Sequence, residues 1–235
     1  MIKINGRIYS GSTITVINGR VINGGKTGEL KKFDEKKTEA ADKVEKIKIN
    51  SSSVDVNISA SNSSNIETYF YGLANVDGEI KFDVQLVNRE LKITLEFEGS
   101  SYDGDLKLDV FVPYKTFKMI FAKSSSADII LNEGILTEQL KVETMSGDVE
   151  IEAMFNAISV TTMSGDVELY ANANKDISVD ISTMSGDVTA AFINIGHINL
   201  YTKTTTGDVR NRHKEGKGYT ANVDIYTMSG DIKIR

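Results

Sequence analysis

Cysteine is absent from this chain of 235 residues, tryptophan is absent too, and proline occurs once, at Pro113. Without cysteine no disulfide can hold the structure, and neither thiolate catalysis nor a thiolate zinc site is available. A single proline is typical of a strand-rich chain with few rigid breaks. Hydrophobic residues make up 40% of the chain, which is enough for a sizeable core.

Long apolar runs are also missing, and Met119–Ala122 is typical of the longest ones. No segment is therefore predicted to span a membrane. No seven-residue apolar stretch follows Met1, so we expect no secretory signal, and the default expectation is a cytoplasmic protein.

The charge is unevenly placed. The net charge is -6, and residues 140–190 carry nine carboxylates against Lys141 and Lys175. Acidity of this kind keeps a protein soluble and repels phosphate backbones, so we expect no nucleic-acid partner.

One phrase returns five times in the C-terminal half, as TMSGDVEI, TMSGDVEL, TMSGDVTA, TTTGDVRN and TMSGDIKI. The spacings between its aspartates are 18, 21, 21 and 23 residues. A period near twenty predicts a stacked repeat, in which each coil buries its apolar face against the next. We therefore predict an all-β, single-domain parallel β-solenoid with coils of about twenty residues.

Apolar residues alternate on both sides of each phrase, and a threonine precedes each turn. Period two predicts strands with one buried face. An antiparallel meander is the alternative, but it would set Glu143 opposite Glu150, and facing like charges destabilise a strand pair. The pattern favours the parallel stack, in which Thr144, Thr162 and Thr183 lie in neighbouring layers.

The turn of each phrase holds a glycine and an aspartate. The glycine predicts a corner with positive φ or crowded backbone. The aspartates are predicted to accept hydrogen bonds from the N–H groups of their own turns, and calcium chelation is the alternative. We expect no metal, no cofactor and a structural role for this column: Gly147, Gly165, Gly186, Gly207, Gly230, Asp148, Asp166, Asp187, Asp208 and Asp231.

Methionine fills a second column of the repeat, at Met145, Met163, Met184 and Met228. Strict alternation from the buried threonine points these side chains outward, where they would form an adaptable interaction surface. In the alternative, the corner rotates them inward as packing.

The remaining segments divide the chain into three parts. Residues 1–25 read as an N-terminal β segment with an Asn18-Gly19 turn. Residues 26–46 are charged, and their apolar residues fall near helical spacing, so they are predicted to form a short capping helix or a solvated linker. Residues 47–235 are predicted to be the solenoid domain, with about nine coils if the loose copies at 77–80 and 103–106 are counted.

No catalytic constellation is evident. His197 and His213 lie in different turns without metal-ligand spacing, and no nucleophile, phosphate-binding or dinucleotide motif is present. The basic stretch from Arg210 to Lys217 is interpreted as a solvated loop, with an anionic partner as the alternative.

The TMSGDV phrases, together with VPYKTF, KSSSADIIL and ITVINGRVING, resemble a bacterial β-strand-repeat family of unknown function whose members are usually labelled putative adhesins. The resemblance implies a β-solenoid, no enzyme activity and no catalytic residues to transfer. The family label implies a cell-surface location, and some relatives are linked to cell-envelope stress.

Together these features predict a non-enzymatic structural or interaction protein of unknown ligand. Its partner would be a protein or a glycan, and its unpaired ends or edges would also allow a homo-oligomer. The alternative is a carbohydrate-binding or carbohydrate-active β-helix protein, which would need acidic and aromatic residues clustered on one outer face.

Overall fold

The computed structural model describes residues 2–4, 7–9, 14–17, 20–23 and 30–235. The first residues form two short antiparallel pairs, which are β1 (Ile2–Ile4) with β2 (Arg7–Tyr9) and β3 (Ile14–Ile17) with β4 (Arg20–Asn23). The second pair agrees with the predicted hairpin, although its Asn18-Gly19 turn lies outside the described residues.

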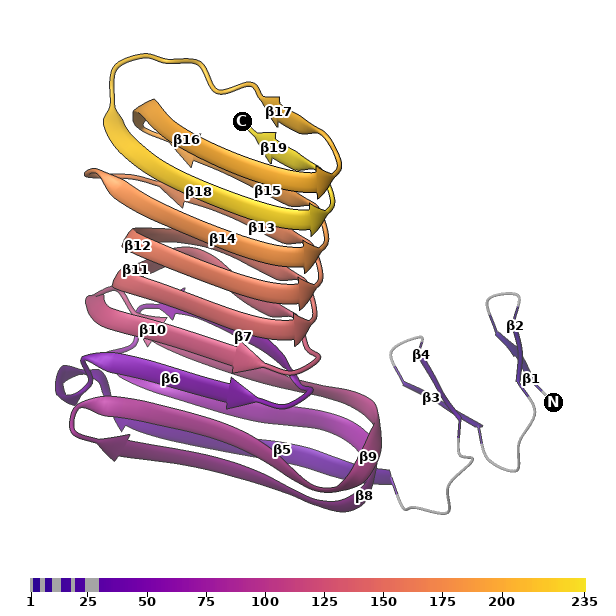
Figure 1. Ribbon diagram of the computed structural model, residues 1–235. Helices are drawn as coiled ribbons and strands as arrows, with labels where there is room; N and C mark the ends of the chain where they lie inside the picture. Colours follow the sequence, from indigo (N-terminus) through magenta and orange to yellow (C-terminus); the bar gives the residue numbers. More distant parts are fainter. Residues whose placement is uncertain (1, 5–6, 10–13, 18–19, 24–29) are drawn as a thin grey trace.

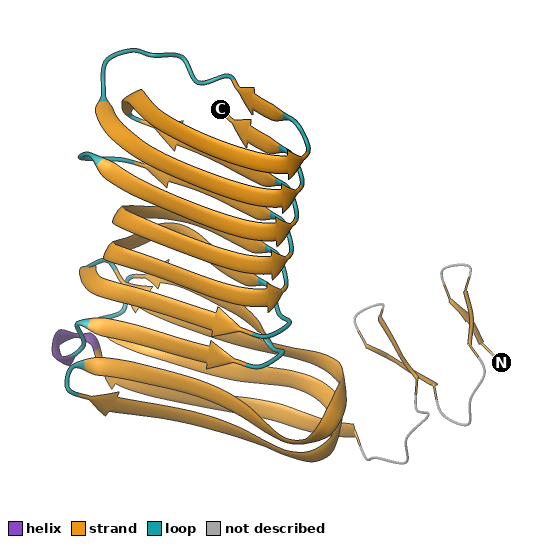
Figure 2. Cartoon of the chain, viewed as in Figure 1, coloured by secondary structure: helices purple, strands orange, loops and turns teal. Residues whose placement is uncertain are grey.

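The strands from β5 onward form one continuous 15-stranded sheet that winds into a flattened coil (Figures 1 and 2). Neighbouring coils pair in parallel, which confirms the predicted all-β solenoid. The threonines of the repeat lie in neighbouring layers, because Thr144 pairs with Thr162 and Thr162 with Thr183. The strands after the N-terminal hairpins are β5 (Leu30–Ala40), β6 (Lys46–Ser51), β7 (Asp55–Ser61), β8 (Asn65–Val87), β9 (Glu90–Pro113), β10 (Thr116–Ser124), β11 (Ile129–Ser146), β12 (Val149–Ser164), β13 (Val167–Asn172), β14 (Ile177–Ser185), β15 (Val188–Ile193), β16 (Ile195–Thr206), β17 (Val209–Asn211), β18 (Tyr219–Ser229) and β19 (Ile232–Ile234).

Each coil contributes one strand segment to each of two faces, with the repeat phrase forming the corner between them. The first face runs in the order β8, β9, β6, β10, β11, β12, β14, β18 and β16. The second face runs in the order β5, β8, β9, β7, β11, β12, β13, β15, β19 and β17.

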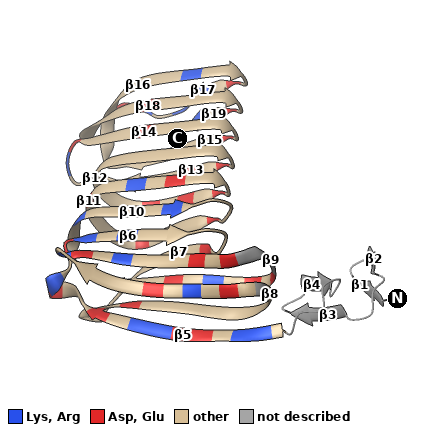
Figure 3. Cartoon of the chain, turned by 60° about the horizontal axis from the view of Figure 1, so that its bottom comes forward, with Lys and Arg blue, Asp and Glu red and all other residues tan. Residues whose placement is uncertain are grey.

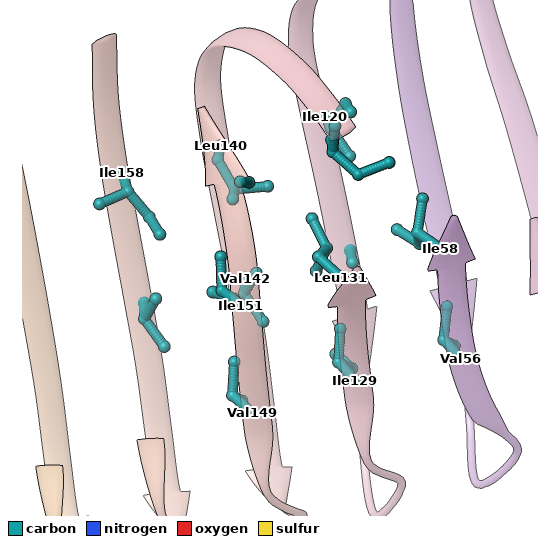
Figure 4. Close-up of a cluster of buried hydrophobic side chains, with 14 of the residues drawn as sticks. Val56, Ile58, Ile120, Ile129, Leu131, Leu140, Val142, Val149, Ile151 and Ile158 are labelled. Atoms are coloured by element: carbon teal, nitrogen blue, oxygen red, sulfur yellow. The ribbon is translucent and has the colours of Figure 1, made fainter. Parts of the chain in front are cut away.

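The core lies between the two faces and consists of stacked aliphatic side chains (Figure 4). Val56, Ile129 and Val149 occupy equivalent positions in three neighbouring coils, and none is more than 1% exposed. Burying such a side chain contributes about 1.5–3 kcal/mol. Because every coil repeats these contacts, stability accumulates along the stack.

Residues 62–115 leave the regular coil and return as a long antiparallel hairpin of β8 and β9. The hairpin turns at Asn88 and Arg89, whose φ values of 52° and 63° suit a tight two-residue turn. The two halves of β9 pair with β6 on the first face and β7 on the second, so the hairpin bends around both faces as an extra layer.

The loose repeat copies at 77–80 and 103–106 are parts of this hairpin and not coils of their own. The register shifts between Asp77 and Glu79, and Gly78 has a φ of 120°. The glycine therefore allows a bulge where the ribbon bends from one face to the other. The prediction of about nine coils was wrong, since hydrogen bonds between successive aspartates join seven stacked turns of the repeat type in residues 30–235.

The predicted capping helix was also wrong. Residues 30–40 form strand β5, which pairs antiparallel with β8 over its whole length, and only Ala41–Lys43 form one turn of 3₁₀ helix, η1. Phe33 packs on Phe70 with ring centroids 5.3 Å apart. Backbone pairing with the hairpin edge therefore overrides the helix-forming side chains of this segment.

The last repeat does not lie at the end of the stack. β18 pairs with β14 on one side and β16 on the other, and β19 lies in the same way between β15 and β17. Figure 1 shows β18 entering below β16 after a loop that returns from β17. The coil of residues 195–211 is therefore the terminal layer, although it precedes the last repeat in the sequence.

Candidate binding surfaces

The corner of the stack carries a ladder of aspartates. Each aspartate side chain accepts a hydrogen bond from the backbone N–H of the aspartate in the next coil, at 2.8–3.2 Å. Six such bonds join seven aspartates in the spatial order Asp55, Asp128, Asp148, Asp166, Asp187, Asp231 and Asp208.

This geometry corrects the expectation that each aspartate bonds within its own turn. A carboxylate that accepts a backbone N–H of the next layer ties the two coils together, and the bond offsets repulsion along the column. In the described residues no group of three or more histidine, aspartate or glutamate side chains is arranged to hold a metal ion.

The glycines of the corner are held against the neighbouring coil. Gly147, Gly165, Gly186, Gly207 and Gly230 have φ values of 148–156°. A Cβ at Gly186 would lie 2.1 Å from the carbonyl oxygen of Gly165. Both physical demands named for this column, positive φ and crowded backbone, are therefore present. The two turns that lack glycine are held differently, since Ser124 Oγ accepts the N–H of Ala127 and Ser51 Oγ accepts that of Val54.

The threonine column lies just inside the corner. Thr144, Thr162 and Thr183 are at most 5% exposed, and their hydroxyl oxygens have no hydrogen-bond partner among the described residues. At the terminal coil the equivalent Thr204 instead donates to the carbonyl oxygen of Gly230 at 3.2 Å. The buried column therefore packs mainly through its methyl groups.

The methionines of the repeat lie on the outside, with exposures of 56%, 48%, 48% and 55% for Met145, Met163, Met184 and Met228. They occupy neighbouring layers because β18 inserts beside β14, which brings Met228 next to Met184. In the sequence the TTTGD copy separates these two residues. We call this row of four side chains the methionine stripe.

The first face has a groove of about 560 Å³ near the hairpin end. Phe121 forms its apolar part, and the ammonium groups of Lys48 and Lys141 lie 5.6 and 5.3 Å from the ring centroid. Glu143 pairs with Lys141 at 2.8 Å and with Lys123 at 3.2 Å, and these bonds lower its pKa. The groove therefore combines an aromatic ring with a partly neutralised basic cluster.

The second face has a polar groove of about 320 Å³, which we call the tyrosine groove. The Tyr71 hydroxyl donates to Asp109 at 3.0 Å, and the Tyr71 ring stacks on Tyr69 at 4.5 Å. The Asn57 amide donates to the same carboxylate at 3.4 Å. The Asn132 amide in turn donates to Asn57 Oδ1 and to Ser59 Oγ. The network holds these polar groups in fixed positions.

Asp55, at the end of the tyrosine groove, has a raised pKa. Desolvation raises the pKa of Asp55, and the charges of Asp128 and Asp105 add to this, while the bond from the Asp128 N–H opposes it. Lys107 is the basic side chain of the lining. With three carboxylates against one ammonium group, the groove disfavours anionic ligands.

Sequence reasoning did not find this groove. Its residues come from β7, β8, β9, β11 and the turn before β11, and the hairpin brings them together only after residues 62–115 fold back. The one local signal was the alternation of Tyr69 and Tyr71, which placed both rings on one side of a strand. Glu150 and Glu168 lie in register on the second face, away from the groove lining.

The histidines and the basic loop lie at the terminal coil. His197 Nδ1 contacts Glu215 Oε1 at 3.1 Å, and its Nε2 contacts Asn199 at 3.1 Å, both at exposed positions. Arg210 pairs with Asp208 at 3.1 Å. The loop of residues 212–218 is largely exposed.

A family model described as Toastrack DUF4097 matches residues 44–235. The chain belongs to the Toastrack DUF4097 family. This confirms the resemblance to bacterial putative adhesins that the repeat phrases indicated. No curated protein sequence is detectably similar to the chain. In the described residues no helix is long and apolar enough to cross a membrane.

Solved structures of two other bacterial proteins are similar to this chain. A putative cell adhesion protein from Clostridium sporogenes is 14% identical, covers 87% of this chain and 99% of its own, and has a TM-score of 0.55. A putative adhesin from Bacteroides fragilis is 14% identical over 88% of this chain and 97% of its own, with a TM-score of 0.43. At such identity the first of these establishes a shared fold and no more.

Proposed function

We propose that this Toastrack protein is a non-enzymatic, adhesin-like binding protein whose partner docks on the outer surface of the coils. The methionine stripe is the observation that carries the proposal. Four unbranched, polarisable side chains, each about half exposed, lie side by side on a rigid corner. Such a row adapts to an apolar protein surface without ordering the backbone.

The description of the similar Clostridium sporogenes structure as a putative cell adhesion protein supports the same proposal. With this function we propose a place at the cell envelope. The corner is suited to docking because the aspartate ladder and the crowded glycines behind it hold the backbone in place. Little conformational entropy is then lost when a partner binds.

The test replaces Met145, Met163, Met184 and Met228 by glutamine, which keeps length and removes apolar character. Purified extracellular-matrix and envelope proteins are arrayed, and binding of the wild-type chain is measured first. We expect the fourfold variant to lose about tenfold or more in affinity for whichever component binds.

The matched control is Glu150→Gln with Glu168→Gln, two exposed side chains on neighbouring coils of the second face. Equal binding by the wild-type protein and the fourfold variant, with circular dichroism showing that both are folded, would contradict a role for the stripe. Turnover of any arrayed component would contradict the non-enzymatic part of the proposal.

A second candidate function is carbohydrate binding in the tyrosine groove. An aromatic ring beside fixed carboxylate and amide groups suits a sugar, whose apolar face stacks while its hydroxyls hydrogen-bond. A glycan array, with and without calcium, would reveal such a ligand.

Variants of the groove sharpen that test. Tyr71→Ala removes both stacking and the hydroxyl, whereas Tyr71→Phe removes only the bond to Asp109. A glycan held in this groove should lose affinity with both variants and more with alanine. Glycan binding that neither variant changes would place the site elsewhere.

A further inference from the structure

The terminal coil leaves strand β16 with one unpaired edge. In the described chain β16 pairs only with β18, and β17 pairs only with β19. The loop of residues 212–218 touches the start of β16, where the N–H of Gly216 donates to Gly196 at 2.9 Å. The rest of the strand faces outward from the stack (Figure 1).

The core is open along this edge. In deeper coils the equivalent side chains Val179 and Val223 are buried, whereas Leu200 of β16 is only half-buried. Val209 of β17 is 44% exposed, although its partner Ile232 is fully buried. One more strand laid along β16 would bury these side chains and satisfy the free backbone groups.

The surroundings of this edge are basic. Residues 195–218 carry five basic and two acidic side chains, a net charge of +3. Because the whole chain has 27 basic and 33 acidic residues, the remainder carries 22 against 31, a net charge of −9. We call the β16 edge with its basic loop the open end.

A second copy of this chain is a poor match for the open end. Another open end would bring two surfaces of net charge +3 together. The edges at the opposite end of the stack, β5 and residues 79–87 of β8, carry five basic and five acidic side chains and so have no net charge. Neither surface offers the negative charge that complements the open end.

We infer that the open end binds an extended, acidic polypeptide segment, which adds to β16 as a further strand. Main-chain hydrogen bonds to the unpaired edge would supply affinity, and alternate side chains would cover Leu200 and Val209. Carboxylates on the segment would meet Lys203, Arg212 and Lys214. This site is distinct from the methionine stripe and from both grooves.

The test measures fluorescence anisotropy of a short labelled peptide in which glutamate alternates with valine. We expect binding that weakens with salt and that is lost when lysine replaces glutamate. N-methylation of the peptide backbone should also abolish binding, because it removes the donors of strand pairing.

Charge-reversal variants locate the site. Lys203→Glu with Arg212→Glu and Lys214→Glu should weaken binding by about tenfold or more. The matched control, Lys31→Glu with Lys32→Glu and Lys36→Glu, makes the same charge change on β5 and should leave affinity unchanged. Equal losses in both variants would mean that only overall charge matters and would overturn the proposal.

Hydrogen exchange gives a readout that does not depend on mutation. The peptide should protect amides of residues 198–206 in β16. Protection confined to residues 212–218 would show a loop contact without strand pairing. Sedimentation that reveals dimers of the free protein, competed by neither peptide nor salt, would assign the edge to a second copy instead. Either result would contradict the inference.

Discussion

The two ends of the solenoid differ in how far their edge strands are protected against further strand pairing. At the lower end β5 places seven charged residues of both signs along eleven positions, and Lys37 donates to the carbonyl oxygen of Phe82 in the adjoining hairpin. At the upper end β16 carries Lys203 as its one formally charged residue in twelve positions. Figure 3 shows the contrast, with red and blue concentrated on β5, β8 and β9.

The difference indicates that only one end is protected against further pairing. Charged side chains on an edge strand oppose the addition of another strand. At the β5 end these charged side chains lie on the edge strand itself. At the open end the charge lies mainly in the flanking loop, and basic residues are in excess. If both ends needed only to be protected against further pairing, we would expect both edge strands to carry charged side chains.

The largest expected effect is a loss of stability that should be greater in the interior of the stack than at its open end. Gly186→Val places a Cβ 2.1 Å from the backbone oxygen of Gly165, in a coil held on both sides. Relieving that clash requires two coils to separate, so we expect a loss of about 3 kcal/mol and a fall in Tm of roughly 6–12 °C.

Gly207→Val is the matched variant, since its Cβ would also lie 2.1 Å from a backbone oxygen, that of Gly230. The terminal coil can move outward, so the Tm of the Gly207→Val variant should fall by less than half as much as that of Gly186→Val. Calorimetry measures both. Equal losses would show that the terminal coil is as tightly held as the interior.

A smaller effect comes from truncating the core. Leu169 is fully buried in β13, and Leu169→Ala should cost about 2–3 kcal/mol, at the lower end of the range for a buried leucine. Leu200→Ala in the half-buried position of β16 should cost less than about half of that, because part of its surface is already in water. Urea denaturation compares the two directly, and a Leu200 loss as large as that of Leu169 would contradict an open end.

Much of the fold follows from the periodicity of the sequence. Alternation on both sides of a fixed turn determines which side chains face the core, and repeats of like residues indicate that coils stack in register. Nothing in that pattern orders the coils in space. The insertion of β18 between β14 and β16 depends on backbone pairing between segments that are far apart in the sequence, and this is a long-range property.

The binding surfaces were predictable to different degrees. Strict alternation from the buried Thr144 predicted an outward Met145, because both lie within one strand. The tyrosine groove was not predictable, since Tyr71, Asn57 and Asn132 meet only through the excursion of residues 62–115. The aspartate ladder lay between these cases. The repeat identified the aspartates, but it placed their hydrogen-bond donors within the same turn, whereas the donors are backbone N–H groups of the next coil.

The smallest expected effects come from the two kinds of aspartate in the ladder. The N–H of Asp231 and the ammonium of Lys233 lower the pKa of Asp187, whereas desolvation and the charge of Asp128 raise the pKa of Asp55. A lowered pKa stabilises the fold above the ordinary value of 3.8, and this contribution is lost as the pH falls through the lowered pKa. A raised pKa destabilises the fold progressively as the pH rises above 3.8.

Replacement by asparagine should therefore have opposite signs at the two positions. At pH 7, Asp187→Asn should lower Tm and Asp55→Asn should raise it, each by no more than about 2 °C because both side chains are partly exposed. Asparagine Oδ1 still accepts the N–H of the next coil, so the comparison isolates charge from hydrogen bonding. Below pH 3.8 the Asp55 difference should vanish first, and the Asp187 difference only at lower pH. A shift of the same sign at both positions would mean that the ladder responds to loss of charge as a unit, and that its neighbours in the stack do not distinguish one rung from another.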